Sequence, residues 1–300
     1  MDEMTIVVTG SSGLLGSALI ESLRGDGSKV LRLVRHRPGS SDEAFWDPAG
    51  GVVDPAALEG ADAVVHLAGA GIGDRRWTPE YKRTLAASRV AGTRTLCKAL
   101  ARLDRKPRVL LSGSAVGFYG DTEDRAVDES ASPGKGFLAG LVHDWEEAAK
   151  PAEKAGIRVV RLRSGLVLTG RGGMLGRLLP IFRIGAGAVL GSGRQYMSWI
   201  SLPDWVAAAR FLLTAEDLSG PVNLTAPEPV TNAEFTKELG KALHRPTMPL
   251  ATPGFVLRLA LGEFAQEGLL TGQRVLPRRL LDARHRFAHP TLEEALPAVL

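Results

Sequence analysis

Two patterns of hydrophobic and polar positions alternate through the first half of the chain. Short β-branched and aliphatic runs predict buried strands, and apolar residues at helical spacing follow them. The predicted strands cover 6–9, 29–35, 44–47, 62–69, 108–114 and 157–163, and the predicted helices include 79–103 and 138–155. Alternating strands and helices predict an α/β fold with a doubly wound parallel sheet.

The alternation of strand and helix patterns changes after Gly165, and Gly and Leu are frequent from there to Gly193. A strand is predicted over 196–201, a helix over 203–215, a strand over 221–224, and mostly helix from 231 onward. We expect a nucleotide-binding domain of residues 1–165, which also receives about 196–224. A smaller, mostly C-terminal substrate lobe comprises 166–195 and 225–300, and we expect a cleft between the two parts.

Three glycines, Gly10, Gly13 and Gly16, separate the first strand from the first helix. A dinucleotide-binding Rossmann turn needs glycine at such positions for a tight turn, close approach to the pyrophosphate, and close helix packing. The new helix N-terminus adds unpaired N–H groups and partial positive charge for the phosphates. The turn therefore predicts a dinucleotide site, and the alternative is a glycine-rich turn without a ligand.

The end of the second strand indicates which dinucleotide is bound. An NAD site usually has an acidic residue there for the ribose 2′-hydroxyl, whereas this chain has Arg35-His36-Arg37. A guanidinium can hold a 2′-phosphate through charged hydrogen bonds, each worth about 1.5–3 kcal/mol. We therefore expect NADP(H) to be preferred over NAD(H) by roughly ten- to a hundredfold. The alternative is a solvated basic turn.

Composition and charge exclude several other classes of protein. The 300 residues are 44% hydrophobic and 23% charged with a net charge of +4, which is ordinary for a globular protein and does not require nucleic acid. The only cysteine, Cys97, lies in an apolar helical pattern and is expected to be an inert core thiol. No apolar run is long enough to span a bilayer, and the first strand begins too early for a signal peptide. We expect a cytoplasmic monomer or homodimer without a membrane partner.

The sequence contains no pattern typical of a metal site or of a hydrolase. The six histidines show no metal-ligand spacing, so no metal site is predicted, and His66 is interpreted as a core histidine inside a strand. There is no G-x-S-x-G elbow and no Walker loop.

Several motifs resemble the extended short-chain dehydrogenase/reductases, also called the NAD-dependent epimerase/dehydratase family. They are Gly10–Gly16, Val64–Gly69, Ser88–Thr93, Leu111–Val116 and Trp199–Asp204. Further stretches are similar to an atypical branch, the "epimerase family protein" group. These are Arg75–Trp77, Asp144–Glu146, Arg163–Val167, Gly191–Gln195 and Gln273–Arg279.

The resemblance implies a set of cofactor-binding residues. It places Gly10, Ser11, Ser12, Gly13, Leu14 and Leu15 around the pyrophosphate, Arg35 at the 2′-phosphate, Leu67, Ala68 and Gly69 under the ribose and nicotinamide, and Val167 near the carboxamide. Arg89 stands where family members usually have an Asn, which implies a contact with the cofactor or with a catalytic water. The alternative for Arg89 is a surface arginine on a helix.

The chain departs from the family at its catalytic centre. The family uses a Ser and a Tyr-x-x-x-Lys pair for proton transfer, but no Tyr-x-x-x-Lys occurs here, and Phe137 and Leu141 fall at those positions. General acid–base catalysis contributes about 10²–10⁴ in rate, so this loss matters. The remaining candidates are Ser114 at the usual serine (or Ser112), Tyr119, which alternatively packs as a loop aromatic, and His143, which alternatively lies on the surface.

A second departure concerns the substrate. Nucleotide-sugar enzymes of the family usually have an Arg where this chain has Met197, which weakens a nucleotide-sugar substrate. Two functions remain open: an NADP(H)-dependent oxidoreductase or epimerase acting on a small carbonyl or hydroxyl compound, or a catalytically inactive NADP(H)-binding sensor or regulator.

Overall fold

The computed structural model describes residues 4–300, which form two compact units. The first unit comprises the chain up to Ser114 with 141–162 and 206–222, and the second comprises 115–140, 163–205 and 223–300. These boundaries differ from the predicted domains, because 115–140 and 196–205 lie in the second unit. Among residues 4–300, no helix has the length and apolar character needed to cross a bilayer.

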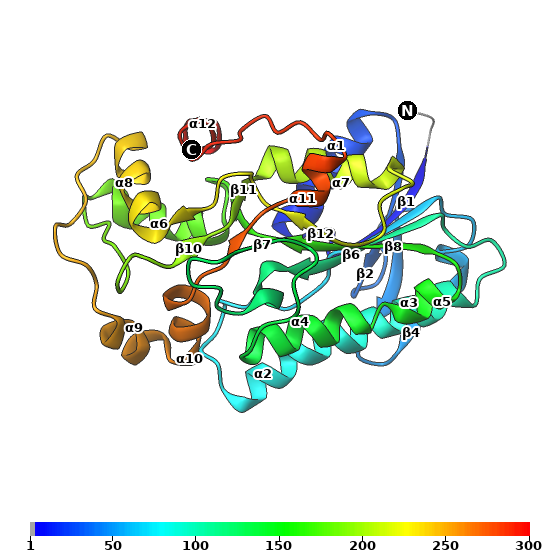
Figure 1. The fold of residues 1–300 in the computed structure, drawn as a ribbon. Helices are drawn as coiled ribbons and strands as arrows, with labels where there is room; N and C mark the ends of the chain where they lie inside the picture. The colour runs from blue at the N-terminus through cyan, green and yellow to red at the C-terminus, as the bar shows by residue number, and fades with distance from the viewer. Residues whose placement is uncertain (1–3) are drawn as a thin grey trace. The chain divides into compact units, whose positions relative to one another are not determined.

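A central eight-stranded sheet has the strand order β12-β8-β6-β5-β1-β2-β3-β4 (Figure 1). Its strands are β1 (Thr5–Thr9), β2 (Lys29–Val34), β3 (Glu43–Asp47), β4 (Val52–Val53), β5 (Ala63–His66), β6 (Val109–Ala115), β8 (Arg158–Ser164) and β12 (Gly220–Leu224). The neighbours from β6 through β5, β1 and β2 to β3 pair in parallel, whereas β4 is antiparallel to β3. This topology confirms the predicted Rossmann sheet. The sequence analysis missed β4, because two residues are too few to show a period.

Helices cover both faces of this sheet in Figure 1, with α1 and α7 over one face and α3 and α5 over the other. The helices of this part are α1 (Leu14–Gly25), α2 (Pro79–Ala86), α3 (Gly92–Ala101), α4 (Phe137–Glu147), α5 (Lys150–Lys154) and α7 (Leu202–Thr214), with a short 3-10 turn at Pro55–Ala57. The single helix predicted over 79–103 contains a π-turn at Ala87–Ala91. The one predicted over 138–155 divides before Pro151, which lacks a backbone N–H for a continuous helix.

The second unit contains three two-stranded sheets and several helices. Its strands are β7 (Ala126–Val127), β9 (Leu166–Leu168), β10 (Tyr196–Met197), β11 (Trp199–Ser201), β13 (Val230–Thr231) and β14 (Arg274–Val275). Its helices are α6 (Gly173–Arg183), α8 (Asn232–Ala242), α9 (Gly254–Leu261), α10 (Glu263–Ala265), α11 (Arg278–Asp282) and α12 (Leu292–Val299), with short turns at Val116–Tyr119 and Gln266–Leu270.

The single strand predicted over 196–201 is two strands, which is a correction to the sequence analysis. β10 pairs with β13, and β11 pairs with β9. Ser198 separates them, because its hydroxyl donates to the Gln273 carbonyl at 2.7 Å and accepts from the Val275 N–H at 2.8 Å.

Each unit has its own apolar core. In the first, Leu33, Trp46 and Leu96 pack around Cys97, which is fully buried. Burial raises the pKa of the Cys97 thiol to about 12, so the inert core thiol is confirmed. In the second, Trp199 packs with Phe235 and neighbouring aliphatic residues.

Candidate dinucleotide-binding site

The turn between β1 and α1 has no room for side chains at two of its three glycines. Gly10 has φ +68°, and a Cβ there would lie 2.7 Å from the Leu67 carbonyl carbon. A Cβ on Gly16 would lie 2.2 Å from the Gly10 carbonyl oxygen. At Gly13 a Cβ would meet only that same oxygen, at 3.2 Å, and Gly13 is exposed. The backbone of the turn thus packs directly against other backbone atoms at Gly10 and Gly16. At Gly13 it is exposed, so a ligand can approach it there.

A buried network of polar side chains holds the end of β5 next to this turn. The Thr9 hydroxyl accepts hydrogen bonds from the Leu67 and Ala68 N–H groups, both at 3.2 Å. It also bonds His66 Nδ1 at 2.7 Å, while His66 Nε2 bonds the Thr93 hydroxyl at 2.9 Å. Burial lowers the pKa of His66 to about 4, so the ring is neutral at pH 7. His66 is therefore a satisfied core histidine, as predicted, and the network fixes the backbone of Leu67 and Ala68.

Arg89 lies on the π-turn that interrupts the helical segment. Such turns are rare, and they often occur at functional sites. The side chain is buried rather than on the surface, so the surface alternative for this residue is wrong. Its guanidinium carbon lies 5.2 Å from the Trp145 ring centroid, and Nη1 donates to the Leu85 carbonyl at 3.4 Å.

The guanidinium of Arg89 reaches the loop that follows β5. A Cβ on Gly69 would lie 3.4 Å from Arg89 Cζ. Within residues 4–300, Arg89 Nε has no hydrogen-bond partner. Burial lowers the pKa of Arg89 to about 10, so it is charged at pH 7. A buried charge with an unused N–H requires a polar partner, and a phosphate or a ribose hydroxyl would supply one.

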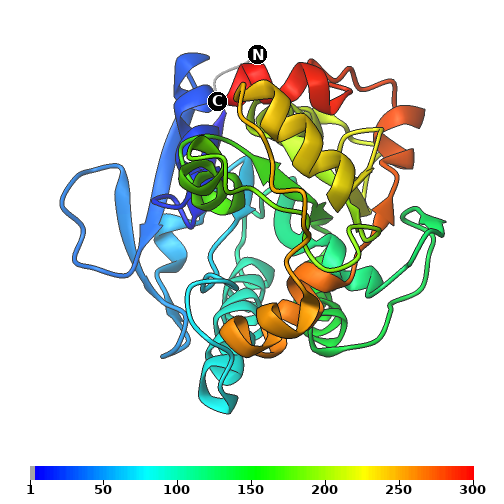
Figure 2. The ribbon, with the colours of Figure 1, turned by 90° about the vertical axis from the view of Figure 1, so that its left-hand side faces the viewer.

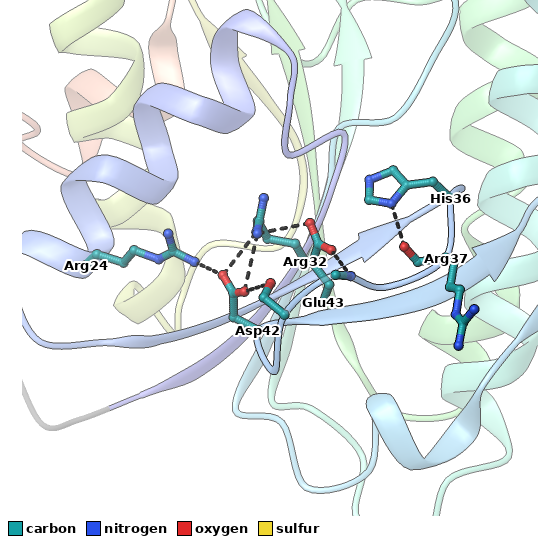
Figure 3. Close-up of polar contacts among 8 residues, drawn as sticks. Arg24, Arg32, His36, Arg37, Asp42 and Glu43 are labelled. Atoms are coloured by element: carbon teal, nitrogen blue, oxygen red, sulfur yellow. Dashed lines mark hydrogen bonds and ion pairs between the residues drawn. The ribbon is translucent and has the colours of Figure 1, made fainter.

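The basic residues around the end of β2 fall into two groups. Asp42 binds Arg24 and Arg32 through ion pairs, and Arg32 also pairs with Glu43 at 3.0 Å (Figure 3). Hydrogen bonds from Ser40 and then from Arg32 hold the pKa of Asp42 well below its usual range. These two arginines are thus already neutralised by acidic neighbours.

Arg35 and Arg37 form the second group. Both are exposed, and neither has an acidic partner in the part of the chain that the structure describes. The His36 ring between them contacts the Arg37 carbonyl at 2.9 Å (Figure 3). The position that the sequence assigns to the 2′-phosphate therefore keeps its positive charge available.

Ser114, at the end of β6, donates its hydroxyl proton to Glu146 Oε1 at 2.6 Å, and both side chains are buried. Glu146 lies on α4, the helix that would carry the Tyr and Lys of the family. Leu141 on that helix is buried, while His143 is exposed. Sequence reasoning quoted Glu146 only as part of a motif and assigned it no chemistry. Its place five residues after Leu141 was the available signal.

Tyr119 lies in the second unit and is buried. Its hydroxyl donates to Asn223 Oδ1 at 2.7 Å and accepts from Arg163 Nη1 at 2.9 Å. Burial raises the pKa of Tyr119 to about 12, and its hydrogen bonds are used within the protein. This geometry favours the packing alternative over proton transfer. Val167, also in the second unit, pairs with Ile200 between β9 and β11.

Together, the sheet order and the glycine turn define a Rossmann fold of the short-chain dehydrogenase/reductase type. The family model described as "NAD dependent epimerase/dehydratase family" matches residues 6–224, and the chain belongs to this family. A second model, a domain of unknown function, matches residues 252–299.

Relatives and solved structures agree with this assignment. An epimerase family protein of Mycobacterium bovis is 52% identical over 99% of this chain and 97% of its own length. The chloroplastic SDR39U1 homolog of Arabidopsis thaliana is 36% identical over 99% of this chain and 87% of its own. The crystal structure of human epimerase family protein SDR39U1 with NADPH has a TM-score of 0.90 at 33% identity and covers 99% of both chains. The resemblance inferred from the motifs is thereby confirmed.

Proposed function

We propose that this chain binds NADP(H), with its pyrophosphate on the turn from Gly10 to Leu15. The observation that carries the proposal is the pair of glycines without room for a Cβ, combined with the open backbone at Gly13. Leu67, Ala68 and Gly69 follow β5 at the same end of the sheet as this turn. Because the carboxyl ends of parallel strands form the ligand-binding edge of such folds, we expect these backbones to line the ribose and nicotinamide.

Two arginines support the choice of cofactor. Arg35 is exposed and has no acidic partner among residues 4–300, so its guanidinium is available for a 2′-phosphate. Arg89 adds a buried charge beside Gly69, and its Nε has no hydrogen-bond partner within the described part of the chain. The human relative's NADPH complex supports the same cofactor. We also expect Val167 to lie near the carboxamide, as the family pattern implies.

We propose that the reaction is hydride transfer with a small carbonyl or hydroxyl compound, by an atypical mechanism. The bound cofactor would supply or accept the hydride. In the oxidation of a hydroxyl compound, the substrate O–H would donate its proton to Ser114 Oγ while the Ser114 proton passes to Glu146, and in the reduction of a carbonyl compound the same two protons would move back. Glu146 lies on the same helix as Phe137 and Leu141, which stand at the family's Tyr and Lys positions, whereas the Tyr119 hydroxyl is bonded to Asn223 and Arg163.

A second candidate is an NADP(H)-binding sensor or regulator without catalysis. The specific observation that favours it is the apolar character of Phe137 and of the buried Leu141 at the family's two proton-transfer positions. A cytoplasmic location and a monomeric or homodimeric state also stay predictions.

A calorimetric titration with NADPH, NADP, NADH and NAD at one salt concentration tests the proposal. Tight NADPH binding with weak NADH binding would support it and justify a screen of carbonyl compounds for NADPH oxidation. Failure of all four to bind would overturn it. Turnover in the screen would favour the enzyme, and binding without turnover across the screen would favour the sensor.

A further inference from the structure

Large exposed apolar side chains gather in two segments of the second unit. Of the twelve exposed large hydrophobics in residues 4–300, eight lie at the end of α6 or between Met248 and the end of α9. We call these eight residues the apolar strip: Ile181, Ile184, Met248, Leu250, Phe255, Val256, Leu259 and Leu261. Ile184, Leu250 and Leu259 are 81%, 78% and 77% exposed, and no residue of α9 is buried.

The two segments of the strip run alongside one another. The Met248 N–H donates to the Gly187 carbonyl at 2.7 Å, and the Thr252 N–H donates to the Val189 carbonyl at 2.8 Å. A Cβ on Gly185 would lie 3.5 Å from Pro246. Figures 1 and 2 both show the segment that joins α8 to α9 passing along this side of the second unit. The loop after α6 therefore lies beside residues 246–252, and the chain continues from there into α9.

The two segments that contain the strip carry basic residues and no acidic ones. No Asp or Glu occurs in residues 154–203 or 239–262, which contain the whole strip. Arg183, Arg245 and Arg258 in these segments are exposed. Of the acids at the borders, Glu238 pairs with Lys241 at 3.1 Å, and the exposed Glu263 begins α10 two residues after Leu261. The strip thus combines protruding aliphatic and aromatic side chains with arginines.

We propose that the apolar strip docks this protein on the surface of an anionic lipid bilayer. Large apolar residues beside basic ones are the composition with which peripheral segments insert at the boundary between headgroups and acyl chains. The arginines would face anionic headgroups. A second copy of this chain fits less well, because a two-fold contact through the strip would bring Arg183, Arg245 and Arg258 of both copies into one interface whose two segments contain no acidic residue to pair with them.

The apolar strip contains none of the residues assigned to the cofactor, and its exposure revises one expectation from the sequence. The absence of a membrane partner was inferred from the lack of an apolar run long enough to span a bilayer. A peripheral surface needs no such run, since it depends on which side chains the fold leaves exposed.

Vesicle co-sedimentation tests the proposal. The protein is mixed with phosphatidylcholine vesicles or with vesicles that also contain phosphatidylglycerol, at low and high salt. We expect sedimentation with the anionic vesicles, weakened by salt because screening reduces the headgroup attraction. Leu259→Asp should lower partitioning roughly tenfold or more, since an inserted apolar group is replaced by a charge that the headgroups repel.

Leu281→Asp is the matched control, because Leu281 is also an exposed leucine on a helix of the second unit but lies outside the strip. It should sediment like the original protein, and unchanged thermal unfolding of both variants would show that they are folded. The proposal is overturned if anionic vesicles are not bound, if Leu259→Asp binds as well as Leu281→Asp, or if phosphatidylglycerol makes no difference. A concentration-dependent dimer that Leu259→Asp abolishes, without vesicle binding, would assign the strip to a second copy instead.

Discussion

A Cβ atom on Gly16 would lie 2.2 Å from the carbonyl oxygen of Gly10, so the first turn of α1 packs directly on the end of β1. Backbone atoms cannot yield as a flexible side chain can. We therefore expect Gly16→Ala to lower the free energy of unfolding by about 1–3 kcal/mol, the usual cost of overpacking. Chemical denaturation of the apo protein measures this.

Gly13→Ala should separate binding from folding at the same turn. A Cβ there meets only the Gly10 oxygen at 3.2 Å, so the variant should fold, but its methyl group would stand where the pyrophosphate approaches. We expect NADPH affinity to fall while stability changes little. Gly25→Ala is the control, because its Cβ would meet nothing within 4 Å, and both properties should be preserved. Full NADPH affinity in Gly13→Ala would show that the cofactor does not lie on this turn.

Arg35→Ala should remove most of the preference for NADPH over NADH. Loss of a charged hydrogen bond of about 1.5–3 kcal/mol corresponds to roughly ten- to a hundredfold in the ratio of dissociation constants. Arg24→Ala, whose guanidinium is bound to Asp42, should leave the ratio unchanged. Calorimetric titration of both variants with both cofactors gives the result, and a preserved preference in Arg35→Ala would place the 2′-phosphate elsewhere.

His66 should make the fold sensitive to acid. Burial lowers its pKa in the folded protein to about 4, below the ordinary value of 6.5, so the unfolded state binds a proton more readily. Stability is therefore complete above pH 6.5 and decreases as the pH falls toward 4, by about 3 kcal/mol at roughly 1.4 kcal/mol per pH unit. Denaturation curves across this range, compared with His66→Gln, isolate the contribution. A parallel decline in the variant would contradict it.

Ser114→Ala should affect turnover, whereas Tyr119→Phe should affect stability. For any substrate found, Ser114→Ala should abolish turnover and leave NADPH affinity nearly unchanged. Tyr119→Phe removes a hydroxyl bonded to Asn223 and Arg163, so it should cost about 1–3 kcal/mol of stability and keep turnover. Steady-state kinetics and denaturation distinguish them. If Tyr119→Phe is stably folded but has lost turnover, Tyr119 takes part in the reaction.

The parts of the fold predicted well are those governed by local chemistry. β1 and β2 were predicted from runs of β-branched and aliphatic residues, and the glycine turn from the steric requirements of a tight connection between strand and helix. Both signals are contained in residues that are neighbours in the sequence. Short elements such as β4 and β9 were missed because they are too brief to show a period. The segment 196–201 was read as one strand because its division depends on Ser198 bonding to residues about 75 positions away.

By itself, the sequence determined the parallel sheet, the glycine turn, the basic end of β2 and the absence of the Tyr-x-x-x-Lys pair. Only the tertiary structure decided that Ser114 bonds Glu146, that Thr9 and His66 together hold Leu67 and Ala68, and that the buried Arg89 has an Nε without a hydrogen-bond partner among residues 4–300. It also decided that no residue of α9 is buried. The physical reason is that hydrophobic periodicity and glycine sterics act between near neighbours in the chain. Hydrogen-bond partners and burial, in contrast, depend on segments that are brought together only when the chain folds.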